Sequence, residues 1–123
     1  MKLVDTSAWI ESLRPGGDPA VAERVRALLT TGEAAWCPIV RLELWNGARG
    51  EHEKRVLREM ERQLMDFEIS PAVWAQAFDL ARKTRAAGQT VPPVDIRIAA
   101  CAAHHDVVLE HCDAHFDALK RFC

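Results

Sequence analysis

The chain has 123 residues, of which 49% are hydrophobic and 28% are charged, a balance typical of one soluble globular domain. Its formal net charge of −2 excludes a strongly basic chain that coats nucleic acid without specificity. No apolar run approaches the roughly 18 residues of a membrane span, and polar residues interrupt the N-terminus, so no signal peptide is expected. These features predict a single cytoplasmic domain over residues 1–123.

Short apolar runs alternate with helical patterns along most of the chain. In chain order the expected elements are a strand at 3–5, helices at 7–13 and 19–31, a strand at 35–38, helices at 39–48 and 51–65, a strand at 67–69, helices at 71–87 and 95–105, a strand at 107–109 and a last short helix at 114–121. Asp18-Pro19 and Ser70-Pro71 are typical helix starts. The alternation favours an α/β fold whose parallel sheet is covered by helices on both faces.

Four acidic residues fall at positions that a parallel sheet would bring to one edge. Asp5 ends the first strand and Asp113 comes soon after the last, whereas Glu43 and Asp95 lie on helices. In sheets of this kind the functional crevice lies outside the carboxyl ends of the strands. We therefore expect the four carboxylates to share one pocket.

The chemistry of such a cluster points to a divalent metal. Carboxylates beside apolar surface are costly unless they are paired or bind a cation, and hard oxygen ligands suit Mg²⁺ or Mn²⁺. Taken alone, Asp5 and Asp95 also fit helix N-caps, and Glu43 also fits a surface position. The four together favour metal-assisted cleavage of a phosphodiester bond.

Four stretches of the chain carry a resemblance to a known family. They are 3–10 (Leu-Val-Asp-Thr-Ser-Ala-Trp-Ile), 40–44 together with Gly47, 93–100 (Pro-Val-Asp-Ile-Arg-Ile-Ala-Ala) and 109–117. In order and spacing they resemble the motifs of the PIN domain, and more narrowly those of the VapC-like toxin ribonucleases of bacterial toxin–antitoxin pairs. The resemblance spans almost the whole chain.

The resemblance implies both a fold and an activity. The fold would be a PIN-like three-layer sandwich with a central parallel sheet of about four or five strands flanked by helices. The activity would be that of a hydrolase, an Mg²⁺- or Mn²⁺-dependent endoribonuclease that cleaves RNA through a metal-activated water. The family further implies a homodimer and a small antitoxin that blocks the active site.

The resemblance also assigns roles to individual residues. The catalytic and metal-binding acids carry over to Asp5, Glu43, Asp95 and Asp113. Thr6 or Ser7 resembles the hydroxyl that supports the first acid. Many relatives have an acid, or a Lys-Asp or Arg-Asp pair, just before the Phe of the last motif, where this chain has His115. That departure leaves Asp117 as an alternative fourth acid, and it makes His115 a candidate contact to RNA phosphate.

The sequence is also compatible with other functions and with one other site. A receiver-type phosphoacceptor domain is disfavoured, because the first strand is not followed by adjacent acids and no lysine lies between 109 and 119. A catalytically silent PIN module and a housekeeping PIN nuclease remain alternatives. A zinc site built from the histidines and cysteines of 101–115 has suggestive spacing, but incidental roles are favoured.

Two further expectations concern the surface. The tryptophans are mostly expected in the core rather than stacked on bases. The apolar faces around Trp74 and Phe78, and around Met60 and Leu64, are wider than one sheet needs to cover. They predict a homodimer interface.

Overall fold

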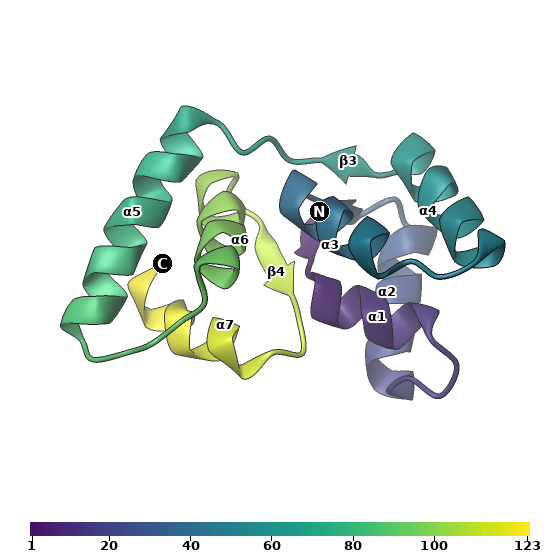
Figure 1. The fold of residues 1–123 in the computed structure, drawn as a ribbon, viewed down its shortest axis with the longest axis horizontal. Helices are drawn as coiled ribbons and strands as arrows, with labels where there is room; N and C mark the ends of the chain where they lie inside the picture. Colours follow the sequence, from purple (N-terminus) through teal and green to yellow (C-terminus); the bar gives the residue numbers. More distant parts are fainter.

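The computed structural model describes all of residues 1–123 and shows a four-stranded sheet in the order β3-β2-β1-β4 (Figure 1). The strands are β1 (Lys2–Val4), β2 (Ala34–Trp36), β3 (Met65–Asp66) and β4 (Val108–Glu110). All neighbouring pairs are parallel, and Lys2 of the central strand β1 pairs with Ala34 on one side and Val108 on the other. The expected α/β class with a central parallel sheet is confirmed.

Seven helices flank the sheet. They are α1 (Thr6–Leu13), α2 (Pro19–Thr30), α3 (Pro38–Gly47), α4 (Glu51–Gln63), α5 (Pro71–Ala86), α6 (Pro93–His104) and α7 (Ala114–Leu119), followed by a 3-10 turn, η1 (Lys120–Phe122). Helices α5, α6 and α7 gather beside β4, and α1 to α4 gather around the other strands (Figure 1). None of the helices is long and apolar enough to cross a membrane.

Side-chain caps fix where several helices begin. Asp5, Asp18, Ser70 and Asp113 each accept a hydrogen bond from a backbone N–H of the following first turn, which satisfies a donor that the helix itself leaves unpaired. Asp5 and Asp113 have this role immediately after β1 and shortly after β4. Their carboxylates are therefore held at the carboxyl edge of the sheet.

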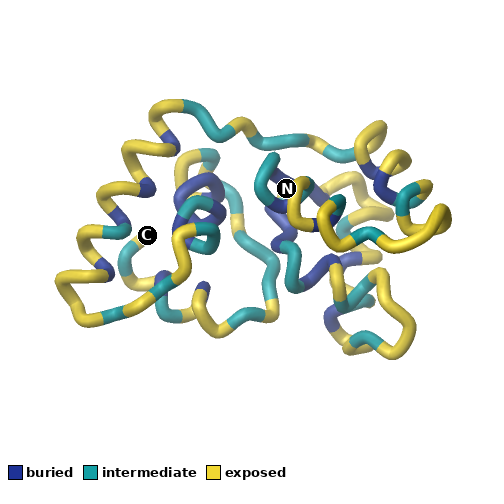
Figure 2. The backbone as a smooth tube through the Cα atoms, in the orientation of Figure 1, coloured by how far each residue is buried: buried dark blue, intermediate teal, exposed yellow.

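The core lies between the sheet and its helices. Trp9 and Trp36 are fully buried there, as expected, together with Leu3, Val40 and Ile98. The buried stretches of the chain run through β1 and β2 and along the inner sides of the helices (Figure 2). Because the small residues of α6 lie in this core, that helix can approach its neighbours closely and carry Asp95 to the edge of the sheet.

Three expectations need correction. The third strand is Met65–Asp66, not 67–69, because pairing with β2 ends after Trp36; Phe67 adds one hydrogen bond, from its N–H to the Trp36 carbonyl (2.8 Å). Asp95 is no N-cap: α6 begins at Pro93, which places Asp95 in the first turn. The expectation that the α4 face around Met60 and Leu64 lies at a dimer interface is wrong, because Met60 is buried within the chain itself and Leu64 packs against the core.

Candidate active site

Asp5 is the most tightly held of the acids. Its side chain is only 4% exposed, and its Oδ2 accepts hydrogen bonds from the Ser7 backbone N–H (3.0 Å) and the Ser7 hydroxyl (2.6 Å). The Ser7 hydroxyl oxygen in turn accepts a bond from the backbone N–H of Cys112 (3.1 Å). Of the two hydroxyls expected to support the first acid, Ser7 contacts Asp5, and it also ties the end of β1 to the segment before α7.

Glu43 approaches the same edge from α3. Its Oε1 accepts a hydrogen bond from the Thr6 hydroxyl (2.8 Å), so Thr6 supports the second acid rather than the first. Leu44 beside it is buried in the core, whereas Leu42 is 65% exposed. Glu43 thus lies at the boundary between core and solvent, with its Oε2 free of any protein hydrogen bond.

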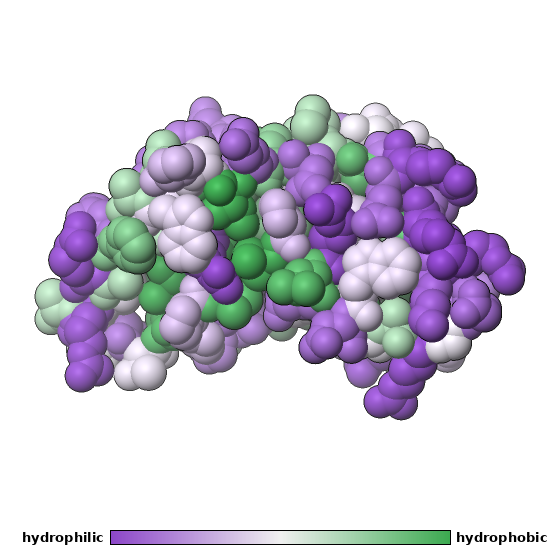
Figure 3. Space-filling view, turned by 45° about the horizontal axis from the view of Figure 1, so that its top comes forward, coloured by the Kyte–Doolittle hydropathy of each residue, from purple (hydrophilic) through white to green (hydrophobic).

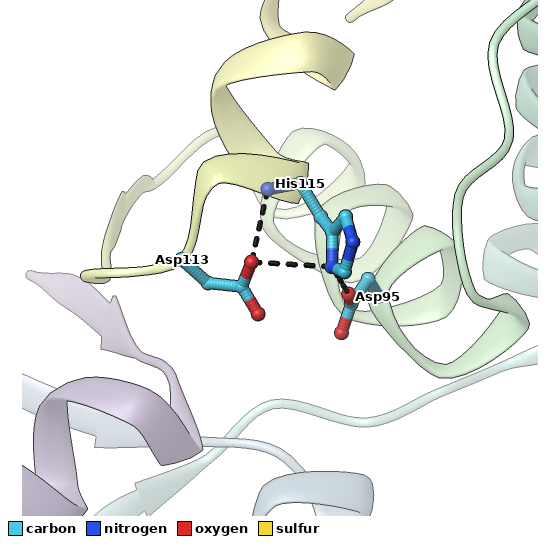
Figure 4. A group of neighbouring side chains, drawn as sticks. All are labelled: Asp95, Asp113 and His115. Carbon is cyan, nitrogen blue, oxygen red and sulfur yellow. Dashed lines mark hydrogen bonds and ion pairs between the residues drawn. The ribbon is translucent and has the colours of Figure 1, made fainter.

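Asp95 and Asp113 meet across a histidine (Figure 4). The Nδ1 atom of His115 lies 2.9 Å from Asp95 Oδ2 and 3.1 Å from Asp113 Oδ1. The backbone N–H of His115 also donates to Asp113 Oδ1 (2.9 Å). His115 therefore joins the first turn of α6 to the start of α7, and it faces the carboxylates instead of standing apart as a separate contact.

The pKa values show that the acids act on one another. Burial raises the pKa of Asp5 against the opposing hydrogen bonds from Ser7, and the charge of Asp113 raises it further. Burial also raises the pKa of Asp95, with Asp113 and Asp5 adding to the effect. For Glu43 the causes of a raised pKa are burial and the charges of Asp5 and Asp95. The structure therefore brings the four expected carboxylates within mutual electrostatic reach, where they repel.

Asp117 does not belong to this cluster. Its side chain is 72% exposed, and its closest basic partner is His111, with 3.8 Å between Nε2 and Oδ1. Between the two candidates for the fourth acid, the geometry favours Asp113. The histidines and cysteines considered for zinc are also dispersed: the His105 ring stacks on Phe67 with its Nε2 2.9 Å from the Glu68 carbonyl oxygen.

The donor atoms fit a hard divalent cation. Asp95, Asp113 and His115 each offer one ligand atom, and these three atoms lie within 4.8 Å of one another. Neither lysine nor arginine forms an ion pair with any of the four acids, and His115 is their only basic partner. A cation such as Mg²⁺ or Mn²⁺ would supply the charge that this cluster lacks, and carboxylate oxygens are the ligands that both ions prefer.

A groove of about 530 Å³ opens beside Glu43, between α1, α3 and α4. Apolar side chains from these three helices line it, including Ile10 and Leu13, which are both substantially exposed. Arg14 and Arg49 lie at its polar margin. The groove thus joins an exposed apolar surface to one wall of the acidic cluster.

Two residues have positions in the site that the sequence did not predict. His115 was expected near the pocket as a contact to RNA phosphate, but it bridges Asp95 and Asp113, and its contact with Asp95 spans 20 positions. Arg97 received no role, although its charge acts on Glu43 and lowers the pKa of that residue. Its place directly after Asp95 and Ile96 was the only available signal.

Comparison with known proteins agrees with this geometry. Residues 2–121 match the PIN domain family. The chain is 35% identical to VapC ribonuclease Mb1587 of Mycobacterium bovis, over 98% of this chain and 92% of that protein. Among solved structures it is similar to FitAcB from Neisseria gonorrhoeae (TM-score 0.73, 22% identity, 98% of this chain and 94% of that one). It is also similar to VapBC-1 from nontypeable Haemophilus influenzae (TM-score 0.71, 19% identity, 98% and 92%).

Proposed function

Because the chain belongs to the PIN domain family and, within it, to the VapC ribonucleases, we propose that it is the toxin of a toxin–antitoxin pair. The activity is that of an endoribonuclease, and its substrate is RNA. The observation that supports this assignment is the electrostatic coupling of Asp5, Glu43, Asp95 and Asp113, together with the close grouping of Asp95, Asp113 and His115.

The residues of the site have different roles in hydrolysis. Asp5, Asp95 and Asp113 would hold Mg²⁺ or Mn²⁺, with Glu43 as a further ligand or as the partner of a bound water. When present, the ion lowers the pKa of water and offsets charge that builds on the phosphate oxygens. Ser7 fixes the orientation of Asp5, and Thr6 that of Glu43. Such support keeps carboxylates aligned before the substrate arrives.

Glu43 is suited to handle a proton. The raised pKa of its carboxyl makes it a better base than an ordinary surface glutamate. Its Oε1 is engaged by Thr6, which leaves Oε2 to take a proton from the attacking water. The water oxygen then forms the new bond to phosphorus, the bond from phosphorus to the leaving ribose oxygen breaks, and that oxygen takes up a proton from solvent.

An antitoxin is the partner that this surface favours. The four acids without an arginine or lysine partner create a strong negative potential, and an arginine fork can bond a carboxylate in bidentate fashion. A partner segment that packs in the groove along Ile10 and Leu13 would lie next to Glu43. We therefore propose a small antitoxin that covers the groove and places a cation among the acids.

A homodimer is also proposed, with a smaller contact surface than the sequence indicated. Trp74 and Phe78 of α5 are 38% and 56% exposed, with ring centroids 5.9 Å apart. Hydrophobic side chains gather near the middle of one face of the molecule, whereas hydrophilic ones dominate its ends (Figure 3). Light scattering at tens of micromolar tests this proposal, and a strict monomer would refute it without touching the nuclease assignment.

The function is tested by cleavage and by growth. Purified protein is incubated with a panel of structured and unstructured RNAs in the presence of Mn²⁺ or Mg²⁺, and in EDTA. We expect cleavage with metal and none with EDTA. Expression of the chain alone should arrest bacterial growth, co-expression of the short protein encoded next to it should restore growth, and Asp95→Asn should be harmless.

Two outcomes would contradict the proposal. Equal cleavage in EDTA, or none across the RNA panel, would remove the metal-dependent ribonuclease. A folded, abundant and active wild-type chain that leaves several bacterial hosts unharmed would point instead to a housekeeping PIN nuclease. A chain that binds the antitoxin but never cleaves would point to the catalytically silent module.

A further inference from the structure

Arg97 is a cation without a partner at the edge of the site. It lies on α6, two positions after Asp95, and its side chain is partly buried. No carboxylate forms an ion pair with it, and its Nε atom is buried without a hydrogen-bond partner. Buried polar groups without partners are costly. The two Nη groups also form no hydrogen bond within the chain, but they are not buried. An acceptor from outside the chain can therefore reach them.

Several other arginines of the chain have carboxylate partners. Arg24 bonds Glu110 across 86 residues, with 2.8 Å between Nε and Oε1, and Arg41 lies 3.0 Å from Asp66. Arg97 is instead covered by an aromatic ring: its guanidinium carbon lies 5.1 Å from the centre of the Trp74 ring. A cation–π contact of this kind fixes the plane of the guanidinium group without using its N–H donors.

Arg97 lies close to the acidic cluster along α6, but on another side of that helix from Asp95. Residues two positions apart on an α-helix do not face each other, and the guanidinium group of Arg97 lies over Trp74 of α5. The charge of Arg97 is felt by Glu43 on α3. Arg97 therefore lies beside the Glu43 wall of the site, and it forms no ion pair with any of the four acids.

We propose that Arg97 binds a phosphate group of the RNA strand next to the cleaved bond, and that Trp74 is the platform that holds its guanidinium group in place. The inference rests on the proposed function, because it takes RNA as the substrate. Phosphate oxygens match the donors of an arginine fork in geometry and charge. The two Nη groups would donate to them, because the buried Nε is out of reach of a molecule outside the fold. A cation is needed at this point because the four acids otherwise repel the RNA backbone.

Binding and cleavage of RNA test the inference. Arg97→Gln is compared with Arg97→Lys and with Arg82→Gln, which removes the same charge from an exposed arginine of α5. Binding of a short fluorescein-labelled single-stranded RNA is measured by anisotropy over a salt series, with Asp95→Asn present in every protein to prevent cleavage. Steady-state cleavage in Mn²⁺ is measured without that change.

We expect Arg97→Gln to weaken RNA binding about tenfold. The slope of log K against log salt should fall by about 0.7, the value for one lost contact to a single-stranded backbone. KM should rise more than kcat falls. Arg97→Lys should keep most of the salt slope but lose affinity, because it retains the charge and loses the fork. Arg82→Gln should change neither quantity.

Trp74→Leu provides a second test that leaves all charges in place. With the platform removed, affinity for the RNA should fall severalfold while the salt slope stays close to that of the parent protein. This variant and Arg97→Lys decide the question if Arg97→Gln does not fold. Light scattering on each variant separates loss of RNA binding from loss of self-association.

The inference is overturned if Arg97→Gln binds RNA as its parent does, or if Arg82→Gln weakens binding equally. It is also overturned if Arg97→Gln changes only the oligomeric state. These outcomes differ from failure of the proposed function, in which the folded wild-type chain neither binds nor cleaves any RNA of the panel.

Discussion

The two sides of the acidic cluster are held in different ways. Asp5 is buried at the end of β1 and is fixed by its own helix cap and by Ser7. Asp95 and Asp113 are more exposed, and they are joined through the ring of His115. The first side is set by the backbone of the fold, whereas the second depends on one replaceable side chain. The Asp5 side should therefore be rigid, and the His115 side should adjust when a cation enters.

The difference between the two sides affects the stability of the metal-free fold and the function of the site in opposite ways. A buried carboxylate that keeps its charge destabilises the metal-free fold, but its fixed position spares the reaction the cost of orienting it. On the other side, Asp95 and Asp113 are held less rigidly, but the His115 ring between them offsets part of the repulsion between their charges. The predictions below, from the largest expected effect to the smallest, are designed to break or sharpen this contrast.

Removing one charge on either side should abolish cleavage. Asp5→Asn and Asp95→Asn each delete a metal ligand at nearly constant volume, and we expect kcat to fall by at least about a hundredfold in both. Asparagine caps helices as well as aspartate does, so Asp5→Asn should still fold. In EDTA, Asp5→Asn should raise the melting temperature more than Asp95→Asn, because its carboxylate is the more buried.

Cleavage assays and calorimetry on the same preparations check this pair of expectations. Asp18→Asn is a matched control, since Asp18 caps α2 far from the cluster. A collapsed fold in Asp5→Asn would mean that Asp5 is structural. Equal thermal gains in the two variants would remove the contrast between the sides.

Replacing His115 should affect metal affinity before it affects the fold. His115→Ala removes the ring that positions Asp95 and Asp113, and changes at such supporting positions typically cost about tenfold or more in metal affinity. The loss should be similar for Mn²⁺ and Mg²⁺, because both ions prefer the carboxylate oxygens that the ring positions. Titration calorimetry with each ion measures both affinities, and exposed His104→Ala is the control. Unchanged affinity for both ions would show that His115 has no part in holding the metal.

The sequence predicted much of this arrangement, for reasons that are local. Alternating apolar patterns and N-caps such as Asp18 and Ser70 act within a few residues, so element order and helix starts could be predicted. Asp5, Asp95 and Asp113 could be placed because each follows a strand or lies near the start of a helix, whereas Glu43 lies inside α3, which a short connection brings to the same edge. β3 was misplaced since a two-residue strand has no periodicity to detect, and its position is set by pairing with β2.

The remaining features depend on contacts between distant parts of the chain. The bridge from His115 to Asp95 and the stacking of Arg97 on Trp74 each join two separate helices. Met60 was expected on an apolar face of α4 left free for a dimer partner, yet it lies in the core of the chain itself, where α4 packs against α3. Such pairings are determined by how the helices pack, which composition and spacing do not specify.

Ser7→Ala tests how much the rigid side depends on one hydroxyl. The change removes the bond to Asp5 and the acceptor for the Cys112 N–H, and we expect a loss of about 1 kcal/mol in the free energy of unfolding. Cleavage should fall severalfold as Asp5 loses its orientation. Ser12→Ala is the control, because Ser12 bonds only the Trp9 carbonyl within the same helix. Equal effects of the two changes on cleavage would show that Asp5 is held by its backbone contact alone.

The smallest expected effect is on the pH dependence of stability in EDTA. The pKa values of Asp5 and Asp95 are raised in the fold, so the folded chain holds these protons more tightly than the unfolded chain, where aspartate titrates near about pH 4. Their contribution to stability is therefore complete below that pH and is lost as the pH rises through the raised folded values.

The melting temperature of wild type should consequently fall relative to Asp5→Asn as the pH is raised from about 4 to 7. The difference between the two proteins isolates Asp5 from surface acids such as Glu59 and Asp79, whose lowered pKa values have the opposite effect. Addition of Mn²⁺ should reverse the trend for wild type only, since ion binding favours the charged carboxylates. Parallel melting curves across this range would show that Asp5 is not destabilised by its burial, and the rigid side of the cluster would then carry no cost in the metal-free fold.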